Sequence, residues 1–249
     1  MNTIYQYMTE RVSMGEPMLA ALFDPEKNDA GQLQCFISAV LKARPQLVFV
    51  GGSQLQSSVD EVVIALKQKV NVPIVLFPGN VMQLSAHVDA LLMLTLISGR
   101  NPDFLIGQQV QAAPIIRRMR VETIATGYIL VEGGTCSAVQ RVSGTQPLTT
   151  ATDIVATAIA GEMMGQQLIY LEAGSGAAQP ISPDIIAQVR AQVSVPLIVG
   201  GGMCTPEAVR RAVQAGADIV VVGNHFEQHP DEMESFVKAM RPRSNAMHL

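Results

Sequence analysis

Small and acidic residues recur directly after short apolar runs in this 249-residue chain. Asp24 ends the first of these runs, and Ser53 comes shortly after the second. One carboxylate with one hydroxyl suits Mg²⁺, which takes few protein oxygens and fills its octahedron with water and substrate phosphates. Asp24 could instead serve as a turn or helix cap, because it precedes Pro25. We therefore treat Asp24 and Ser53 as candidate metal ligands, with the cap as the alternative.

Two glycine clusters later in the chain predict an anion site. Gly200, Gly201 and Gly202 are consecutive, and Gly223 precedes Asn224 at the end of the next apolar run. Without a Cβ, the backbone N–H groups can approach a tetrahedral anion closely. These glycines could also form only tight turns. The favoured interpretation is a site for the phosphate of a small phosphorylated substrate.

A third glycine-rich segment contains a phenol and a carboxylate two residues apart. Tyr170 and Glu172 lie at i and i+2 of an apolar run, so both side chains point to one face of a strand. A glutamate there can accept the proton of a substrate hydroxyl, and the tyrosine can hold the same group. In a purely structural role, Glu172 would only neutralise a nearby lysine. Lys27 and Arg100 are candidates for a second phosphate group, although each could be an ordinary surface charge.

Eight short apolar runs must position these residues. They read as continuous rather than alternating apolar, which is typical of strands buried on both faces of a parallel sheet. Helix-length segments fill most of the gaps between them, such as Pro206 to Ala215, and no linker divides the chain. The count and the length predict an α/β protein with one (β/α)₈ TIM barrel over residues 1–249. The predicted strands are Met18 to Phe23, Leu47 to Val50, Ile74 to Phe77, Ala90 to Leu96, Tyr128 to Val131, Leu168 to Leu171, Leu197 to Val199 and Ile219 to Val222.

One unit of this pattern is too short. Only residues 78–89 separate the third run from the fourth, and a full helix with two loops does not fit there. We expect the third barrel helix to be missing or replaced by a short segment, which would open an apolar groove in the wall. A short 3₁₀ turn without any role is the alternative.

Composition excludes several classes of function. Lys and Arg number 17 against 21 Asp and Glu, and a net charge of −4 argues against nucleic acid as a partner. Three cysteines without metal-ligand spacing indicate neither a zinc site nor a disulfide framework. The chain has no run of about 18 uncharged apolar residues, so the sequence predicts no membrane span. We expect a cytoplasmic protein.

The motifs resemble those of a known family, the geranylgeranylglyceryl phosphate synthases and their bacterial heptaprenyl relatives. The likeness extends from about Phe23 to Phe226, and its most specific part is the string Tyr170 to Gly176. The matching segments are Phe23-Asp24-Pro25-Glu26-Lys27, Val50-Gly51-Gly52-Ser53, Phe77-Pro78-Gly79-Asn80, Tyr170-Leu171-Glu172-Ala173-Gly174-Ser175-Gly176, Val199-Gly200-Gly201-Gly202 and Val222-Gly223-Asn224.

This resemblance implies a barrel that binds sn-glycerol 1-phosphate and a polyprenyl diphosphate with Mg²⁺ and joins them by an ether bond. It implies that Asp24 and Ser53 serve the metal and that the prenyl chain lies along the opening left by the third helix. The residues that would bind glycerol phosphate are Tyr170, Leu171, Glu172, Ala173, Gly174, Ser175 and Gly176 for the glycerol, and Gly201, Gly202, Gly223 and Asn224 for its phosphate.

The expected function is therefore a Mg²⁺-dependent prenyltransferase that releases pyrophosphate, with geranylgeranyl as the expected donor group. Tyr170, Glu172 and Asp24 are the predicted catalytic residues. A phosphosugar isomerase, epimerase or synthase barrel is one alternative, and a non-catalytic barrel that binds a phosphorylated metabolite is another. We also expect peripheral membrane contact for the prenyl chain. A small homo-oligomer is expected, through apolar residues such as Leu105, Ile106, Ile115 and Ile116.

Overall fold

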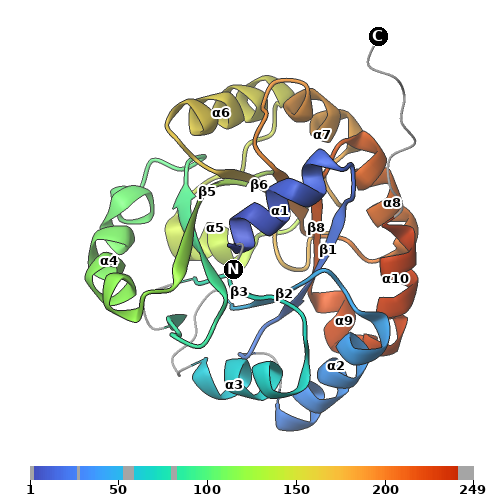
Figure 1. The fold of residues 1–249 in the computed structure, drawn as a ribbon. Coiled ribbons are helices and arrows are strands. Elements are labelled where there is room, and N and C mark those ends of the chain that lie inside the picture. The colour runs from blue at the N-terminus through green and yellow to red at the C-terminus, as the bar shows by residue number, and fades with distance from the viewer. Residues whose placement is uncertain (1–2, 27–28, 53–58, 80–82, 241–249) are drawn as a thin grey trace.

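Eight parallel strands form a closed barrel in the computed structural model, in the order β1 to β8 with β8 paired to β1 (Figure 1). The structure describes residues 3–26, 29–52, 59–79 and 83–240. The predicted (β/α)₈ barrel is confirmed. The strands are β1 (Met18–Phe23), β2 (Leu47–Val50), β3 (Ile74–Leu76), β4 (Ala90–Leu96), β5 (Glu122–Leu130), β6 (Leu168–Glu172), β7 (Leu197–Gly200) and β8 (Ile219–Val222).

Helices surround the barrel and cover most of its outer face (Figure 1). Local signals start several of them. Thr205 caps α8 by accepting a hydrogen bond from the backbone N–H of Ala208, and Pro206 occupies the first turn. The helices are α1 (Ile4–Ser13), α2 (Ala30–Ala43), α3 (Asp60–Lys69), a π-helical turn η2 (Asp103–Gly107), α4 (Gln108–Met119), α5 (Ala138–Ser143), α6 (Ala151–Met163), α7 (Pro183–Arg190), α8 (Pro206–Ala215), α9 (Asn224–Gln228), a 3₁₀ turn η3 (Pro230–Glu232) and α10 (Met233–Ala239).

The strands are apolar on both faces because each face packs against its own core. Phe49 and Leu47 belong to a cluster inside the barrel, whereas Val48 and Val50 belong to the layer between strands and helices. All four are fully buried. This double burial explains why the sequence shows continuous apolar runs rather than alternation.

The amino-terminal helix α1 lies across one end of the barrel (Figure 1). Its Met8 is fully buried in the interior cluster. The carboxylate of Glu122, at the start of β5, accepts hydrogen bonds from the backbone N–H groups of Ile4 (2.6 Å) and Tyr5 (3.0 Å). This satisfies two donors that have no partner within the helix and fixes α1 over the amino-terminal ends of the strands.

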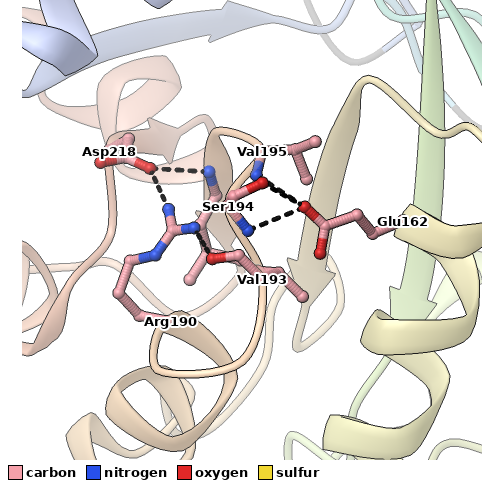
Figure 2. Close-up of polar contacts among 7 residues, drawn as sticks. Glu162, Arg190, Val193, Ser194, Val195 and Asp218 are labelled. Atoms are coloured by element: carbon pink, nitrogen blue, oxygen red, sulfur yellow. Dashed lines mark hydrogen bonds and ion pairs between the residues drawn. The ribbon is translucent and has the colours of Figure 1, made fainter.

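Figure 2 shows a second polar network, which surrounds the segment between α7 and β7. The guanidinium of Arg190 pairs with Asp218 at 2.7 Å and also donates to the carbonyl of Val193. Asp218 accepts a further hydrogen bond from the backbone N–H of Leu197 at 2.8 Å. Glu162, on α6, accepts from the backbone N–H groups of Ser194 and Val195. These carboxylates therefore link three helix–strand units at the entry to β7.

The wall between β3 and β4 is thin, as the spacing predicts. The described residues 77–79 and 83–89 include no α-helix. Instead, Asp89 closes the short connection, since its carboxylate accepts from the backbone N–H of Ile74 (2.8 Å) and pairs with Lys67 (2.6 Å). The missing third barrel helix is therefore confirmed for the part of the connection that the structure describes.

Two sequence-based expectations need correction. The fifth strand begins at Glu122 rather than at Tyr128, so it is longer than its apolar run. Ile116 is buried in the chain's own core, so it is unavailable to a second copy, whereas Ile106 stays exposed. No helix within the described ranges combines the length and the apolar character needed to cross a bilayer.

Candidate active site

A cavity of about 560 Å³ opens at the carboxyl ends of the strands, opposite α1. Residues at or just after the carboxyl ends of six strands line it, including Asp24, Gly51, Pro78, Glu172, Gly201 and Gly223. The helix α5, which follows β5, contributes Val139 and Arg141 to the same lining. The barrel therefore places the chemically competent residues of distant segments around one space.

Among the described residues, Glu172 and Asp24 are the two buried carboxylates that line this cavity. Glu172 ends β6 and is 7% exposed. Burial raises its pKa to about 7, although the backbone N–H of Gly174, which donates to Oε1 at 2.7 Å, opposes this rise. A carboxylate with a pKa near neutrality is suited to accept a proton from a substrate hydroxyl.

The hydroxyl of Tyr170 lies beside Glu172. A Cβ placed on Gly200 would lie 2.6 Å from the Tyr170 hydroxyl and 2.8 Å from Glu172 Oε2, so both groups face the same point of β7. The hydroxyl lies close enough to Glu172 to lower the pKa of that carboxyl, but it has no partner with full hydrogen-bond geometry among the described residues. Since a buried hydroxyl without a partner is costly, a bound ligand would satisfy it.

Two loop glycines adopt backbone conformations that other residues rarely adopt. Gly201 and Gly202 have φ of +84° and +68°. A Cβ on Gly201 would lie 2.7 Å from Glu172 Oε1 and 2.8 Å from the backbone nitrogen of Gly174. The neighbouring loops are linked, since the Ser175 hydroxyl donates to Asn224 Oδ1 at 3.1 Å. The loops after β6, β7 and β8 thus form a compact, side-chain-poor pocket next to Glu172.

Asp24 lies on the opposite side of the cavity, at the end of β1. Its carboxylate is 6% exposed and accepts a hydrogen bond from the backbone N–H of Glu26 at 3.1 Å. A Cβ on Gly52 would lie only 2.2 Å from Asp24 Oδ1, so the glycine leaves room for the carboxylate. Ser53, the second candidate metal ligand, lies outside the described residues.

The Asp24 carboxylate, with Ser53 as the second candidate, fits a hard cation that keeps water and substrate oxygens as most of its ligands. No cluster of three or more His, Cys, Asp or Glu side chains suited to a metal ion occurs among the described residues. A single buried carboxylate beside a glycine-lined space is compatible with Mg²⁺ held jointly by Asp24 and phosphate oxygens. It does not resemble the closed ligand set of a structural zinc site.

The cavity continues from the barrel mouth across β4. Leu92 and Leu96 of this strand belong to the interior cluster, whereas Leu91 and Met93 pack in the outer layer, and all four line the cavity. Ala112 and Ile116 of α4 complete the outer part. The groove therefore follows the outer face of β4, next to the position where a third barrel helix would otherwise lie.

The two basic residues predicted to bind a second phosphate, Lys27 and Arg100, are not seen in the cavity lining of the described residues. Lys27 lies outside the described residues. Arg100 is exposed, is not among the lining residues, and donates to the carbonyls of Gly99 (2.7 Å) and Ile97. Arg141, which we did not single out from the sequence, lines the cavity and donates to the carbonyl of Cys136 at 2.8 Å. No local motif marks Arg141, because only the fold places α5 over the barrel mouth.

The other predicted site residues come together at this end of the barrel. The structure brings Asp24, Tyr170, Glu172, Gly174, Ser175, Gly176, Gly201, Gly202, Gly223 and Asn224 into the lining of one cavity. Leu171 and Ala173 are buried in the outer core, and they support the loop from behind rather than line the cavity.

Comparison with known proteins gives consistent matches. The model of the PcrB family matches residues 13–240. Geranylgeranylglyceryl phosphate synthase from Flavobacterium johnsoniae is 46% identical over 230 residues, which cover 91% of this chain and 95% of the relative. The synthase of the same name from Chitinophaga pinensis is 40% identical over 247 residues, which cover 97% of this chain and 98% of that relative.

A solved structure is also similar. The crystal structure of (S)-3-O-geranylgeranylglyceryl phosphate synthase from Thermoplasma acidophilum, in complex with its substrate sn-glycerol-1-phosphate, superposes with a TM-score of 0.90. The identity is 27%, and the match covers 96% of this chain and 99% of that one.

Proposed function

The chain belongs to the PcrB family of prenyltransferases, and on this premise we propose that it transfers a polyprenyl group to the C3 hydroxyl of sn-glycerol 1-phosphate. The family resemblance predicted from the motifs is confirmed. The observation that supports the reaction best is the position of Glu172. This buried carboxylate lies beside the glycine-rich loops and lines the same cavity as the apolar groove.

The proposed step exchanges one C–O bond for another. The bond between C1 of the allylic donor and its diphosphate oxygen breaks, and the electron pair leaves with the diphosphate. A lone pair of the glycerol oxygen forms the new bond to C1, and the hydroxyl proton passes to Glu172. The products are the prenyl ether of glycerol phosphate and pyrophosphate.

The glycine-rich loops suit the glycerol phosphate. Backbone N–H groups around Gly201, Gly202 and Gly223 would bind its phosphate, and Asn224 would add its amide. The unpartnered hydroxyl of Tyr170 would bind the glycerol beside Glu172. This arrangement orients the C3 hydroxyl before the donor reacts, which removes part of the entropic barrier.

Asp24 would hold a Mg²⁺ ion on the other side of the cavity, with Ser53 as the second expected ligand. When bound, the ion would neutralise the charge that develops on the departing diphosphate. Asp24 contributes its carboxylate and, through its bond to the Glu26 amide, a fixed orientation. The donor's apolar chain would follow the groove over β4.

A direct assay tests this proposal. Purified protein is incubated with Mg²⁺, sn-glycerol 1-phosphate and labelled prenyl diphosphates of several lengths, with geranylgeranyl as the expected donor. A lipid-soluble ether product with stoichiometric pyrophosphate supports the proposal. No product with any donor overturns it, and turnover of a phosphosugar or mere binding of glycerol phosphate would favour the alternatives.

Two expectations about partners stay predictions. Light scattering of the purified protein measures whether it forms a small homo-oligomer. Sedimentation with lipid vesicles, with and without donor, measures peripheral membrane contact.

A further inference from the structure

Three aromatic rings line the cavity between Asp24 and Glu172. Phe77 follows β3, Tyr128 belongs to β5 and Tyr170 to β6. The Phe77 and Tyr170 rings are nearly parallel, with centroids 5.4 Å apart and an interplanar angle of 27°. Tyr128 lies 5.2 Å from Tyr170 and 6.1 Å from Phe77. We call these three residues the aromatic floor.

The aromatic floor connects the two chemically active sides of the cavity. On one side, the backbone of Phe77 packs against Gly51, where an added Cβ would lie 1.9 Å from the Phe77 carbonyl oxygen. Gly52, the next residue in the chain, lies against the Asp24 carboxylate. On the other side, Tyr170 lies beside Glu172. Since the three rings line the same cavity as Asp24 and Glu172, a carbon that reacts between a diphosphate near Asp24 and a hydroxyl near Glu172 would lie near them.

The space beneath the floor is packed with apolar side chains. Phe49 is fully buried and lies 6.4 Å from Phe77 without lining the cavity. Burial raises the pKa of both Tyr128 and Tyr170 well above the ordinary value, so the phenols stay neutral. The rings consequently offer neutral π surfaces in a dry environment, where a cation over an aromatic face gains most.

We propose that the aromatic floor stabilises the positive charge that develops on the allylic carbons of the donor as its C1–O bond breaks. The inference rests on the proposed function and deepens it by assigning a catalytic contribution to Phe77, Tyr128 and Tyr170. The electron-rich ring faces attract this charge only in the transition state. They therefore lower the barrier without tightening the binding of the neutral prenyl chain.

Fluorination of Phe77 tests the proposal with little change of shape. Successive fluorine atoms on the ring remove its negative facial potential, so 4-fluoro-, 3,5-difluoro- and 3,4,5-trifluorophenylalanine at position 77 form a graded series. We expect kcat to fall stepwise, by roughly tenfold at the trifluoro ring, while the KM of the donor stays within about twofold. The matched control is the same series at Phe49, which lies under the floor and should leave kcat unchanged.

The outcomes separate this inference from the function on which it rests. Absence of product with the unmodified protein refutes the proposed function itself. Normal turnover combined with a flat response to fluorination at Phe77 overturns the aromatic floor alone, as does an equal response at Phe49.

A second pair of variants covers the case in which the modified chains fold poorly. Tyr128→Phe keeps the ring and should retain most of kcat, whereas Tyr128→Leu removes the ring and should lower kcat at unchanged donor KM. Equal kcat values for the two variants would contradict the proposal.

Discussion

Glu172 has a pKa raised to about 7 by burial, with Tyr170 beside it and the Gly174 amide bound to it. As the proposed proton acceptor, it would have to be ionised before the glycerol hydroxyl reacts. We expect kcat/KM to rise with pH and to reach half its maximum near pH 7, because this ratio reports groups of the free enzyme. Glu172→Gln should lose roughly 100-fold or more in kcat. A rate that is flat between pH 5.5 and 8 would contradict this role.

The Glu172 carboxylate should make the folded chain less stable as the pH rises, whereas kcat/KM should increase over the same range. Its pKa in the folded chain lies above the ordinary value of 4.5 for a glutamate, so the folded state binds the proton more tightly than the unfolded state does. Stability is therefore highest below about pH 4.5 and is lost as the pH rises through about 7. The variant Glu172→Gln lacks this loss and should be more stable than the unmodified chain at pH 8, by on the order of 3 kcal/mol. Urea denaturation at both pH values measures the difference, and an equal stability at pH 8 would argue against an ionised buried carboxylate.

Asp24 separates metal binding from glycerol phosphate binding. Asp24→Ala should abolish Mg²⁺-dependent turnover, while calorimetry still shows binding of glycerol phosphate, because the glycine loops lie on the other side of the cavity. Asp24→Asn is the control for the local turn, since its side-chain oxygen can still accept from the Glu26 amide. Should Asp24→Ala keep near-normal synthesis, the metal assignment is wrong.

The loop after β7 depends on glycine for its shape. Gly201→Ala would place a methyl group 2.7 Å from Glu172 Oε1 at a φ of +84°. We expect a destabilisation of about 2 kcal/mol or more and a large rise in the KM of glycerol phosphate. Gly144→Ala is the matched control, because φ there is +66° and nothing lies within 4 Å of the added carbon. Equal effects of the two variants would mean that backbone strain alone matters.

The units around β7 are joined by the polar network of Figure 2. Asp218 is nearly buried and pairs with Arg190 at 2.7 Å, so Asp218→Asn leaves a guanidinium without its counter-charge. We expect a loss of about 3 kcal/mol in the free energy of unfolding, with kcat unchanged, since the network lies away from the cavity lining. Thermal denaturation and the prenyl transfer assay measure the two effects. A change in kcat without a change in stability would contradict a purely structural role for Asp218.

Strands whose own residues form a continuous apolar run could be predicted from the sequence. The strands from Met18, Leu47 and Ile219 begin where their apolar runs begin, because each is buried on both faces. The first half of β5 lacks such a run. Its Thr126 is fully buried, and its hydroxyl donates a hydrogen bond to the carbonyl of Ile124. This local hydrogen bond allows a polar residue to lie in the barrel interior. A sequence pattern does not distinguish that residue from one in a loop.

Features that depend on distant partners could not be predicted. The start of α1 is fixed by Glu122, which lies 118 residues from Ile4. Arg141 joins the cavity only because α5 lies over the barrel mouth. The glycine loops, Asp24 and the Tyr170–Glu172 pair were accessible to reasoning because strand-end residues of a barrel share one end.

The whole barrel should respond to its ligands. Residues from most strand ends line one cavity, so a ligand that binds the folded chain alone stabilises all of it. At 100 times its Kd, a prenyl diphosphate should raise the melting temperature by roughly 5–10 °C. Inorganic pyrophosphate is the control, and an equal shift with it would show that the apolar chain adds nothing.

Under the proposed function, the groove along β4 would give the two reactants separate entrances. A small hydrophilic alcohol would arrive through the polar opening at the strand ends, while a hydrocarbon tail would leave sideways past Leu91 and Met93. Extra isoprene units would then extend beyond the protein's flank and leave the spacing between the reacting atoms untouched. The length of the tail and the rate of bond formation would then be independent of each other.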